Sequence, residues 1–330
     1  MNYQLLKSLC ECFGPSGYEE KVREFIIEQI KDNVDEYYTD HIGNLIAHKK
    51  GNGKKVMIAA HMDQIGLMVT DITKEGYIKF TNLGYLAPEQ TICQRVRFEN
   101  GRVGVIGVEH KENRKGLKIS DLYVDVYAKD KEDALKNFKV GDVAVYTHPA
   151  EILEEHIMAP ALDDRYGVFI AIETIKAIKN NDNDMYFVFT VQEEVGLRGA
   201  KTAAFNIQAD YGIALDVTIS GDELGDKHVP MKMGNGVAIK VKDSSLLVNP
   251  IVKNWMINTA KDKNICYQLE ILEAGGTDGG AMQLTGRGAL SGVLSVPIRY
   301  VHSASEIAAK KDIEASFDLL LALLEKPINL

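Results

Sequence analysis

Residues 186–191 form a short apolar run that leads, after one glutamine, into two adjacent carboxylates, Glu193 and Glu194. The run has the length and composition of a strand covered on both faces, so the two acids are expected at the end of a buried strand. Carboxylates in such a position are costly to desolvate, and they usually hold a cation or transfer a proton. The rest of the chain must therefore provide further ligands for a cation.

Four other segments place a histidine or an acid directly after an apolar run. They are His61 and Asp63 after 56–60, Asp163 and Asp164 after 160–162, Asp216 after 212–215, and His302 after 292–301. Each residue alone is more often an ordinary loop residue, but open α/β sheets place their functional sites at the carboxyl ends of strands. The recurrence of the pattern at five strand ends predicts one shared site.

Imidazole and carboxylate groups are ligands that suit zinc, cobalt or manganese. Three acids and two histidines are too many for one tetrahedral ion, but they suffice for two ions if one carboxylate bridges them at a separation of about 3.5–4 Å. With a bridging hydroxide the charges balance. Glu193 is then left as an uncoordinated base for the attacking water, and Asp63 can orient the ring of His61.

Strand-like and helical segments alternate along most of the chain, which predicts an α/β fold with a mostly parallel sheet flanked by helices. The first expected helix is 16–31, which a capping box of Ser16 and Glu19 would open. The other expected helices are 166–179, 197–205, 250–263 and a C-terminal helix with Ile313, Phe317, Leu320 and Leu324 on one face. The expected strands are 42–47, 56–60, 186–191, 211–215, 237–241 and 265–271.

Residues 66–153 have a different sequence pattern, with short runs of alternating apolar and polar residues, frequent turn signals and one helical stretch at 131–138. We interpret this part as a small inserted β-barrel-like or sandwich domain. The expected division is therefore a first catalytic segment at 1–65, the insert at 66–153, and a second catalytic segment at 154–330.

Composition excludes several classes of function. The formal net charge is -9 and no useful basic stretch occurs, which argues against a nucleic-acid partner. No apolar run approaches the roughly 18 residues of a membrane span. Cys10, Cys12, Cys93 and Cys266 form no C-x-x-C pair, so reduced thiols in the cytoplasm are the simplest interpretation. No P-loop, His-Glu-x-x-His helix or nucleophile-elbow serine is present.

Over essentially its whole length the chain resembles the M42 family of dinuclear metallo-aminopeptidases, which includes the tetrahedral and glutamyl aminopeptidases. The motifs that carry the resemblance are Ala60-His61-Met62-Asp63, Ala161-Leu162-Asp163-Asp164-Arg165-Tyr166-Gly167, Val191-Gln192-Glu193-Glu194-Val195-Gly196, Ala214-Leu215-Asp216, Gly275-Gly276-Thr277-Asp278 and Val301-His302-Ser303-Ala304-Ser305-Glu306. The early insert between His61 and Asp163 favours this family over related dizinc peptidases, in which the insert lies later.

The resemblance implies a zinc-peptidase-like fold and a metal-dependent aminopeptidase that acts on short peptides. His61, Asp163 and Asp216 would hold one metal ion, and Asp163, Glu194 and His302 the other. Zinc is preferred for both ions, and cobalt or manganese fit the same ligands. Glu193 would be the general base and Asp63 the residue that orients His61. The family also implies a cis peptide at Asp163–Asp164 and pairing through the insert, giving a homo-oligomer built from dimers and commonly a dodecamer.

Other functions stay open at this point. A deacylase or carboxypeptidase could use the same pair of metal ions, a glycosidase is a less favoured alternative, and a non-catalytic scaffold would lack metal. Neighbouring Glu193 and Glu194 are poorly placed to flank a glycosidic bond. The glycine-rich segment 274–280 either lines the substrate site, where Asp278 would meet the substrate, or is only a tight turn. The preferred N-terminal residue is not evident from the sequence.

Overall fold

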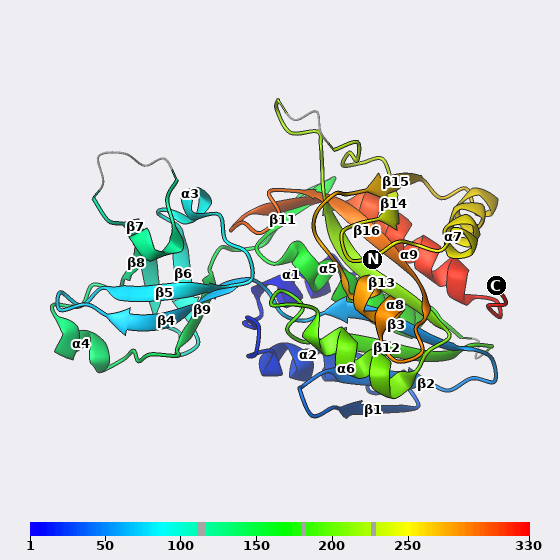
Figure 1. Cartoon of the computed structure of the whole chain (residues 1–330), viewed down its shortest axis with the longest axis horizontal. Coiled ribbons are helices and arrows are strands. Elements are labelled where there is room, and N and C mark those ends of the chain that lie inside the picture. Colours follow the sequence, from blue (N-terminus) through cyan, green and yellow to red (C-terminus); the bar gives the residue numbers. More distant parts are fainter. Residues whose placement is uncertain (111–115, 180–181, 226–228) are drawn as a thin grey trace.

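The alternation of strands and helices produces a large α/β unit, and the inserted segment forms a barrel that projects from it (Figure 1). The computed structural model describes residues 1–110, 116–179, 182–225 and 229–330. Within these residues, no helix is both long and apolar enough to cross a bilayer.

The α/β unit is built on an 11-stranded sheet with the order β1-β2-β12-β3-β13-β16-β17-β11-β10, to which β14 is joined through β16 and β15 through β14. The strands are β1 (Glu36–Thr39), β2 (Leu45–Lys49), β3 (Lys55–His61), β10 (Glu151–Ile152), β11 (His156–Ala159), β12 (Asp184–Thr190), β13 (Tyr211–Ile219), β14 (Val237–Lys242), β15 (Tyr267–Ile271), β16 (Leu290–Arg299) and β17 (Glu306–Ala309).

The centre of this sheet is parallel and its flanks are antiparallel. Strand β3 pairs in parallel with β12 and β13, and β13 pairs in parallel with β16. In contrast, β2 joins β12 and β17 joins β16 in antiparallel orientation. The predicted α/β class is confirmed, and the parallel arrangement holds for the central strands, so the sheet as a whole is mixed.

Helices cover both faces of the central strands, which explains why those strands are continuous apolar runs. The helices of the unit are α1 (Tyr3–Glu11), α2 (Glu20–Ile30), α5 (Leu162–Ala177), α6 (Arg198–Ile207), α7 (Pro250–Asp262), α8 (Asp278–Leu284) and α9 (Lys310–Leu324). Helix α5 packs on β3 and β13 and also contacts α1, α2 and α9. Helices α6 and α8 pack on each other, α6 also on β12 and β3, and α8 also on β16, β13 and β3. The apolar side chains between these layers form one continuous core.

The insert forms a closed barrel in the order β4-β5-β8-β7-β6-β9, and closure leaves it no free sheet edge. Its elements are β4 (Gly66–Ile72), β5 (Ile78–Leu83), α3 (Pro88–Thr91), β6 (Arg95–Phe98), β7 (Val103–Val108), the 3-10 turn Ile119–Asp121, β8 (Leu122–Asp125), α4 (Lys131–Leu135) and β9 (Val143–Tyr146). Phe98 and Phe138 pack in its own apolar core, with ring centroids 4.7 Å apart. The predicted barrel is confirmed, while the domain boundaries at 65/66 and 153/154 stay a prediction.

Several local expectations were wrong. Helix α2 begins at Glu20 and carries no side-chain cap from Glu19, so the capping box of Ser16 and Glu19 does not form. Helix α1 was not expected, and neither was α8, into which the glycine-rich segment 274–280 continues. Ser16 and Glu19 form hydrogen bonds with residues distant in the sequence instead of with each other's backbone, as described for the site below.

Candidate metal centre

The parallel register of the central strands aligns the predicted ligands at one edge of the sheet. Thr190 of β12 pairs with His61 of β3, so Glu193 and Glu194 lie just beyond that histidine. Ala214 of β13 pairs with Ala59 of β3, which places Asp216 level with His61. Asp163 lies at the start of α5, and His302 in the loop between β16 and β17.

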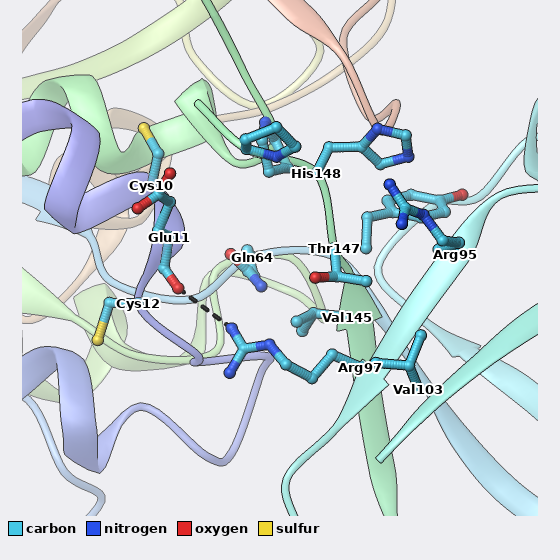
Figure 2. A pocket seen from close by; sticks show the side chains of 13 residues that line it. Cys10, Glu11, Cys12, Gln64, Arg95, Arg97, Val103, Val145, Thr147 and His148 are labelled. Atoms are coloured by element: carbon cyan, nitrogen blue, oxygen red, sulfur yellow. Dashed lines mark hydrogen bonds between the residues drawn. The ribbon is translucent and has the colours of Figure 1, made fainter. Parts of the chain in front are cut away.

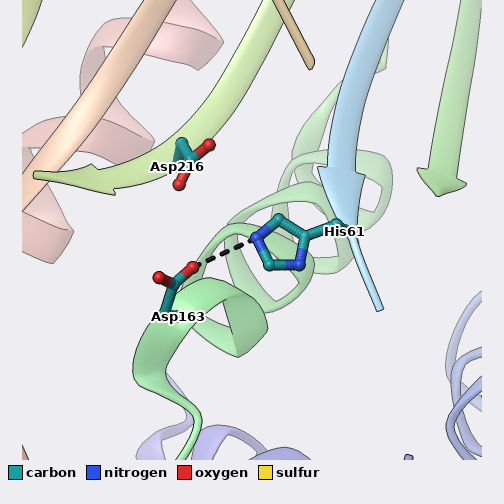
Figure 3. A group of neighbouring side chains, drawn as sticks. All are labelled: His61, Asp163 and Asp216. Atoms are coloured by element: carbon teal, nitrogen blue, oxygen red, sulfur yellow. Dashed lines mark hydrogen bonds and ion pairs between the residues drawn. The ribbon is translucent and has the colours of Figure 1, made fainter. Parts of the chain in front are cut away.

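The structure brings all five predicted ligands together in two overlapping groups. His61, Asp163 and Asp216 form one group, which Figure 3 shows, and Asp163, Glu194 and His302 form the other. Within each group one ligand atom from every residue lies within 4.8 Å of the others. Asp163 is the member common to the two groups.

Asp163 is placed as a bridge between the two histidines. Its Oδ1 lies 3.1 Å from Nε2 of His61, and its Oδ2 lies 3.2 Å from Nε2 of His302. The same nitrogen of His302 is 3.4 Å from Oε2 of Glu194. A carboxylate that offers one oxygen to each side is the arrangement that two neighbouring cations require.

Asp63 has a wider set of contacts than the sequence indicated. Nδ1 of His61 lies 3.0 Å from the backbone carbonyl of Asp63 and 3.5 Å from its carboxylate, so the carbonyl is the nearer acceptor. The carboxylate itself accepts hydrogen bonds from the backbone N–H groups of Glu193 and Glu194, at 3.0 and 3.2 Å, and from the hydroxyl of Ser16, at 2.6 Å. Asp63 thus positions the two glutamates as well as His61.

Glu193 and Asp278 lie beside these groups without belonging to them. Oε2 of Glu193 is 4.0 Å from Nε2 of His61, and its side chain is 11% exposed. Asp278, at the first position of α8, is buried and accepts a 2.6 Å hydrogen bond from the hydroxyl of Thr190. Its Oδ1 has no partner among the described residues.

The peptide between Asp163 and Asp164 is cis, as the resemblance implied. The Asp164 carboxylate accepts hydrogen bonds from the backbone N–H groups of His61 and Gly167, each at 3.1 Å. A Cβ at Gly167 would lie 2.4 Å from that carboxylate, so glycine is required there. The second aspartate of the pair therefore links β3 to α5.

Two further buried carboxylates, Glu306 and Glu19, support the site, and the sequence did not assign either of them to it. Glu306 accepts the backbone N–H of Asp163 through Oε2, at 3.1 Å, and that of His302 through Oε1, at 2.8 Å. Glu19 accepts the backbone N–H groups of Gly17 and Gln192. The only available signal was the position of Glu306 four residues after His302.

The barrel borders the site through the loop after β5. A Cβ at Gly84 would lie 2.9 Å from Oε2 of Glu194, which leaves room only for glycine. The ring of Tyr85 lies 6.2 Å from that of His302, and Tyr85 is 67% exposed. The insert therefore forms one wall of the space in front of the ligands.

The electrostatics of the site fit divalent cations. Burial, together with the charge of Asp163, raises the pKa of Asp216 to about 8, and burial raises the pKa values of Glu193 and Glu194 well above their usual range. Burial opposes ionisation of Asp163 as well, but hydrogen bonds from His302 and His61 outweigh it and lower its pKa. Oε1 of Glu194 is buried without a partner in the described chain. The crowded acids lack positive charge, and metal ions would supply it.

Comparison with known proteins gave consistent matches. A family described as M42 glutamyl aminopeptidase matches residues 43–319. A putative aminopeptidase of Acetivibrio thermocellus is 49% identical over 320 residues, covering 97% of each chain. A lysyl aminopeptidase of Pyrococcus furiosus is 37% identical, covering 100% of this chain and 99% of the other.

Solved structures of similar fold were also found. An aminopeptidase from Desulfurococcus kamchatkensis superimposes with a TM-score of 0.94 at 36% identity, over 98% of this chain and 94% of that one. The TET1 peptidase of Pyrococcus horikoshii gives a TM-score of 0.88 at 35% identity, over 99% of each chain, and that protein can assemble into a tetrahedron or a large octahedral shell.

The raised pKa of Asp216 predicts how the metal-free protein responds to pH. Folding raises this pKa from 3.8 to about 8, so between these values the native state binds more protons than the unfolded state. Stability without metal should therefore fall as pH rises through this window. Asp216→Asn should flatten the dependence of melting temperature on pH, measured with a chelator from about pH 5 to 8. Equal slopes for the two proteins would contradict this.

Proposed function

Because the chain belongs to the M42 family of aminopeptidases, which hydrolyse peptide bonds, we propose that it removes the N-terminal residue of short peptides at a dinuclear metal centre. The observation that carries this proposal is the position of Asp163 between His61 and His302, one carboxylate oxygen toward each. This is the feature that distinguishes a site for two ions from a site for one.

His61, Asp163 and Asp216 would hold the first ion, and Asp163, Glu194 and His302 the second. Zinc is the ion we favour, and cobalt or manganese suit the same nitrogen and oxygen ligands. When bound, the two ions would activate the attacking water as a hydroxide, polarise the scissile carbonyl and provide a contact for the free amine of the substrate.

Glu193 is proposed as the general base. It lies next to His61 yet outside the two ligand groups, and burial raises its pKa toward the range in which a carboxyl group can accept and return a proton. Glu193 would take a proton from the attacking water and pass it to the leaving amine. Asp63 keeps this glutamate in place through its hydrogen bond to the Glu193 backbone.

The surroundings of the ligands would bind the peptide. We propose that Asp278 borders the substrate, supported by its position at the start of α8 and by the unpartnered Oδ1 within the described residues. Tyr85 of the barrel is exposed, its ring lies 6.2 Å from that of His302, and it would contact the peptide there. A cytoplasmic location is also part of the proposal, supported by the four free cysteines.

Glu193→Gln should separate chemistry from metal binding. The variant keeps all ligands, so we expect it to retain two ions per chain while turnover falls by about 10²–10⁴-fold, the usual contribution of a general base. Metal content by elemental analysis and turnover on an aminoacyl anilide measure the two effects. Glu194→Gln is the matched control, because it removes a ligand and should lower the metal content. Near-normal turnover in Glu193→Gln with full metal content would exclude Glu193 as base.

A free amine should be essential in the substrate. An aminopeptidase binds that amine at the metal centre, whereas a deacylase or carboxypeptidase using the same centre does not need it. We therefore expect hydrolysis of an amino-acid anilide and none of its N-acetylated form, with activity lost on chelation. A comparison across different first residues would also define the side-chain preference. Faster cleavage of the acetylated form would favour the deacylase.

We propose that the chain forms a homo-oligomer built from dimers, paired through the barrel. The assembly of the TET1 peptidase of similar fold into closed shells supports this, and a dodecamer is the larger form we consider. Light scattering on the metal-loaded protein should give a mass of two or twelve chains. A monomer at micromolar concentration would contradict the proposal.

A further inference from the structure

A second hollow lies between the barrel and the α/β unit, and none of the five metal ligands lines it (Figure 2). We call it the interdomain cavity, and its volume is about 370 Å³. The barrel contributes residues of β6 and β9, and the α/β unit contributes the end of α1 and the segment after β3. The residues that matter for its chemistry are Glu11, Gln64, Arg95, Arg97, Thr147 and His148.

The barrel wall of the cavity is basic. Arg95 and Arg97 are two residues apart on β6, so their side chains leave the same face of the strand. The Arg97 guanidinium donates to the backbone carbonyl of Glu11 at 3.1 Å, and it forms no ion pair with the residues that the structure describes. Arg95 forms no ion pair with any residue of the described chain. Two guanidinium groups thus face one hollow with spare hydrogen-bond donors.

The other ionisable groups of the cavity do not neutralise these arginines. Glu11 is the only acid among the lining residues, and its carboxylate accepts the backbone N–H of Ala150 at 3.0 Å and lies 3.7 Å from Nζ of Lys7. Nε2 of His148 is 3.1 Å from Oε1 of Gln94. Burial lowers the pKa of His148, and the positive charge of Arg95 lowers it further.

A buried amide points to a missing partner on the opposite wall. Gln64 is 4% exposed, and its Oε1 is buried without a hydrogen bond to any described residue. In Figure 2 its side chain lies between Glu11 and Thr147, above Arg97. Buried polar groups of native proteins are nearly always hydrogen-bonded. Because a carbonyl oxygen only accepts hydrogen bonds, Oε1 as placed would meet a donor of a bound molecule, such as a hydroxyl group, and not a phosphate oxygen. Rotation of the amide by half a turn would offer its N–H₂ group instead.

We propose that the interdomain cavity binds a phosphate-bearing small molecule, held by Arg95 and Arg97 of the barrel and by Gln64 of the α/β unit. Planar guanidinium groups pair with phosphate through two parallel hydrogen bonds, and a dianion matches two of them better than a single carboxylate does. The volume exceeds that of a bare phosphate ion and falls in the range of small-ligand pockets. Because the ligand contacts residues of the two units, it would tie the barrel to the α/β unit.

The test uses the full-length, metal-loaded protein, with inorganic phosphate and glycerol 3-phosphate as probes. Each is titrated at constant ionic strength, with sodium chloride and sodium acetate as reference salts, and binding is followed by calorimetry and by melting temperature. Phosphate bound at the metal centre would be common to all variants, so the difference between variants reports on the cavity. The tighter of the two probes identifies the ligand as a monoester or as free phosphate.

We expect saturable binding in the wild type that becomes about tenfold weaker in Arg95→Gln and in Arg97→Gln, the effect of losing one charge-assisted hydrogen bond. Arg102→Gln, an exposed arginine of the same barrel outside the cavity, should bind as the wild type does. Aminopeptidase turnover should be unchanged in all three variants, which separates this test from that of the proposed function. Unaltered affinity in Arg95→Gln and Arg97→Gln, or equal binding of acetate and phosphate, would overturn the proposal.

A crystal soaked with tungstate gives a second measurement that needs no variant. Anomalous density between Arg95 and Arg97 is the expected result. Tungstate at the metal centre alone, with an empty interdomain cavity, would overturn the assignment.

Discussion

The structure depends on the negative charge concentrated at the carboxyl ends of its central parallel strands. Asp163 lies in one group with His61 and Asp216 and in another with Glu194 and His302, and the ligand atoms of each group lie within 4.8 Å of one another. Asp163 and Asp216 are buried, so water solvates their carboxylates poorly. Burial of several ionised carboxylates is unfavourable unless cations or N–H donors compensate them. The pKa values of Asp216 and Glu194 are raised because too little positive charge compensates their buried carboxylates. The pKa of Asp163 is lowered because hydrogen bonds from His302 and His61 already stabilise its ionised form.

Buried carboxylates around the proposed ligands hold them in position by accepting hydrogen bonds from their backbone N–H groups. Asp63 accepts the N–H groups of Glu193 and Glu194, Asp164 accepts that of His61, and Glu306 accepts those of Asp163 and His302. Each of these acids accepts a hydrogen bond from a peptide group, which fixes the position of a proposed ligand's Cα and leaves its side chain free to face the other ligands. Charge-assisted hydrogen bonds of this kind are stronger than neutral ones, so the geometry is held before any ion binds.

The sequence predicted those features that follow from local pattern and from strand order. Continuous apolar runs identified β3, β12 and β13, and because parallel strands end at one edge, His61, Glu194 and Asp216 could be expected together. Long-range partners were beyond such reasoning. Ser16 and Glu19 fit a local capping box, but their side chains bind Asp63 and the backbone of Gln192, residues that only the folded sheet brings near. The antiparallel strands at the two edges of the sheet likewise depend on strand pairings that the local periodicity of apolar residues does not reveal.

The barrel has its own apolar core, but some of its residues lie close to the proposed metal ligands. The chain enters the barrel at β4, just after Asp63 and Gln64, so the same short segment contributes to the proposed metal site and to the interdomain cavity. In the loop after β5, Gly84 lies next to Glu194 and Tyr85 lies near His302. A small rotation of the barrel would therefore move Tyr85 relative to His302 and change the space available to a peptide. Any molecule that fixes the barrel against the α/β unit, a second copy of the chain included, would act on the shape of the site through this loop.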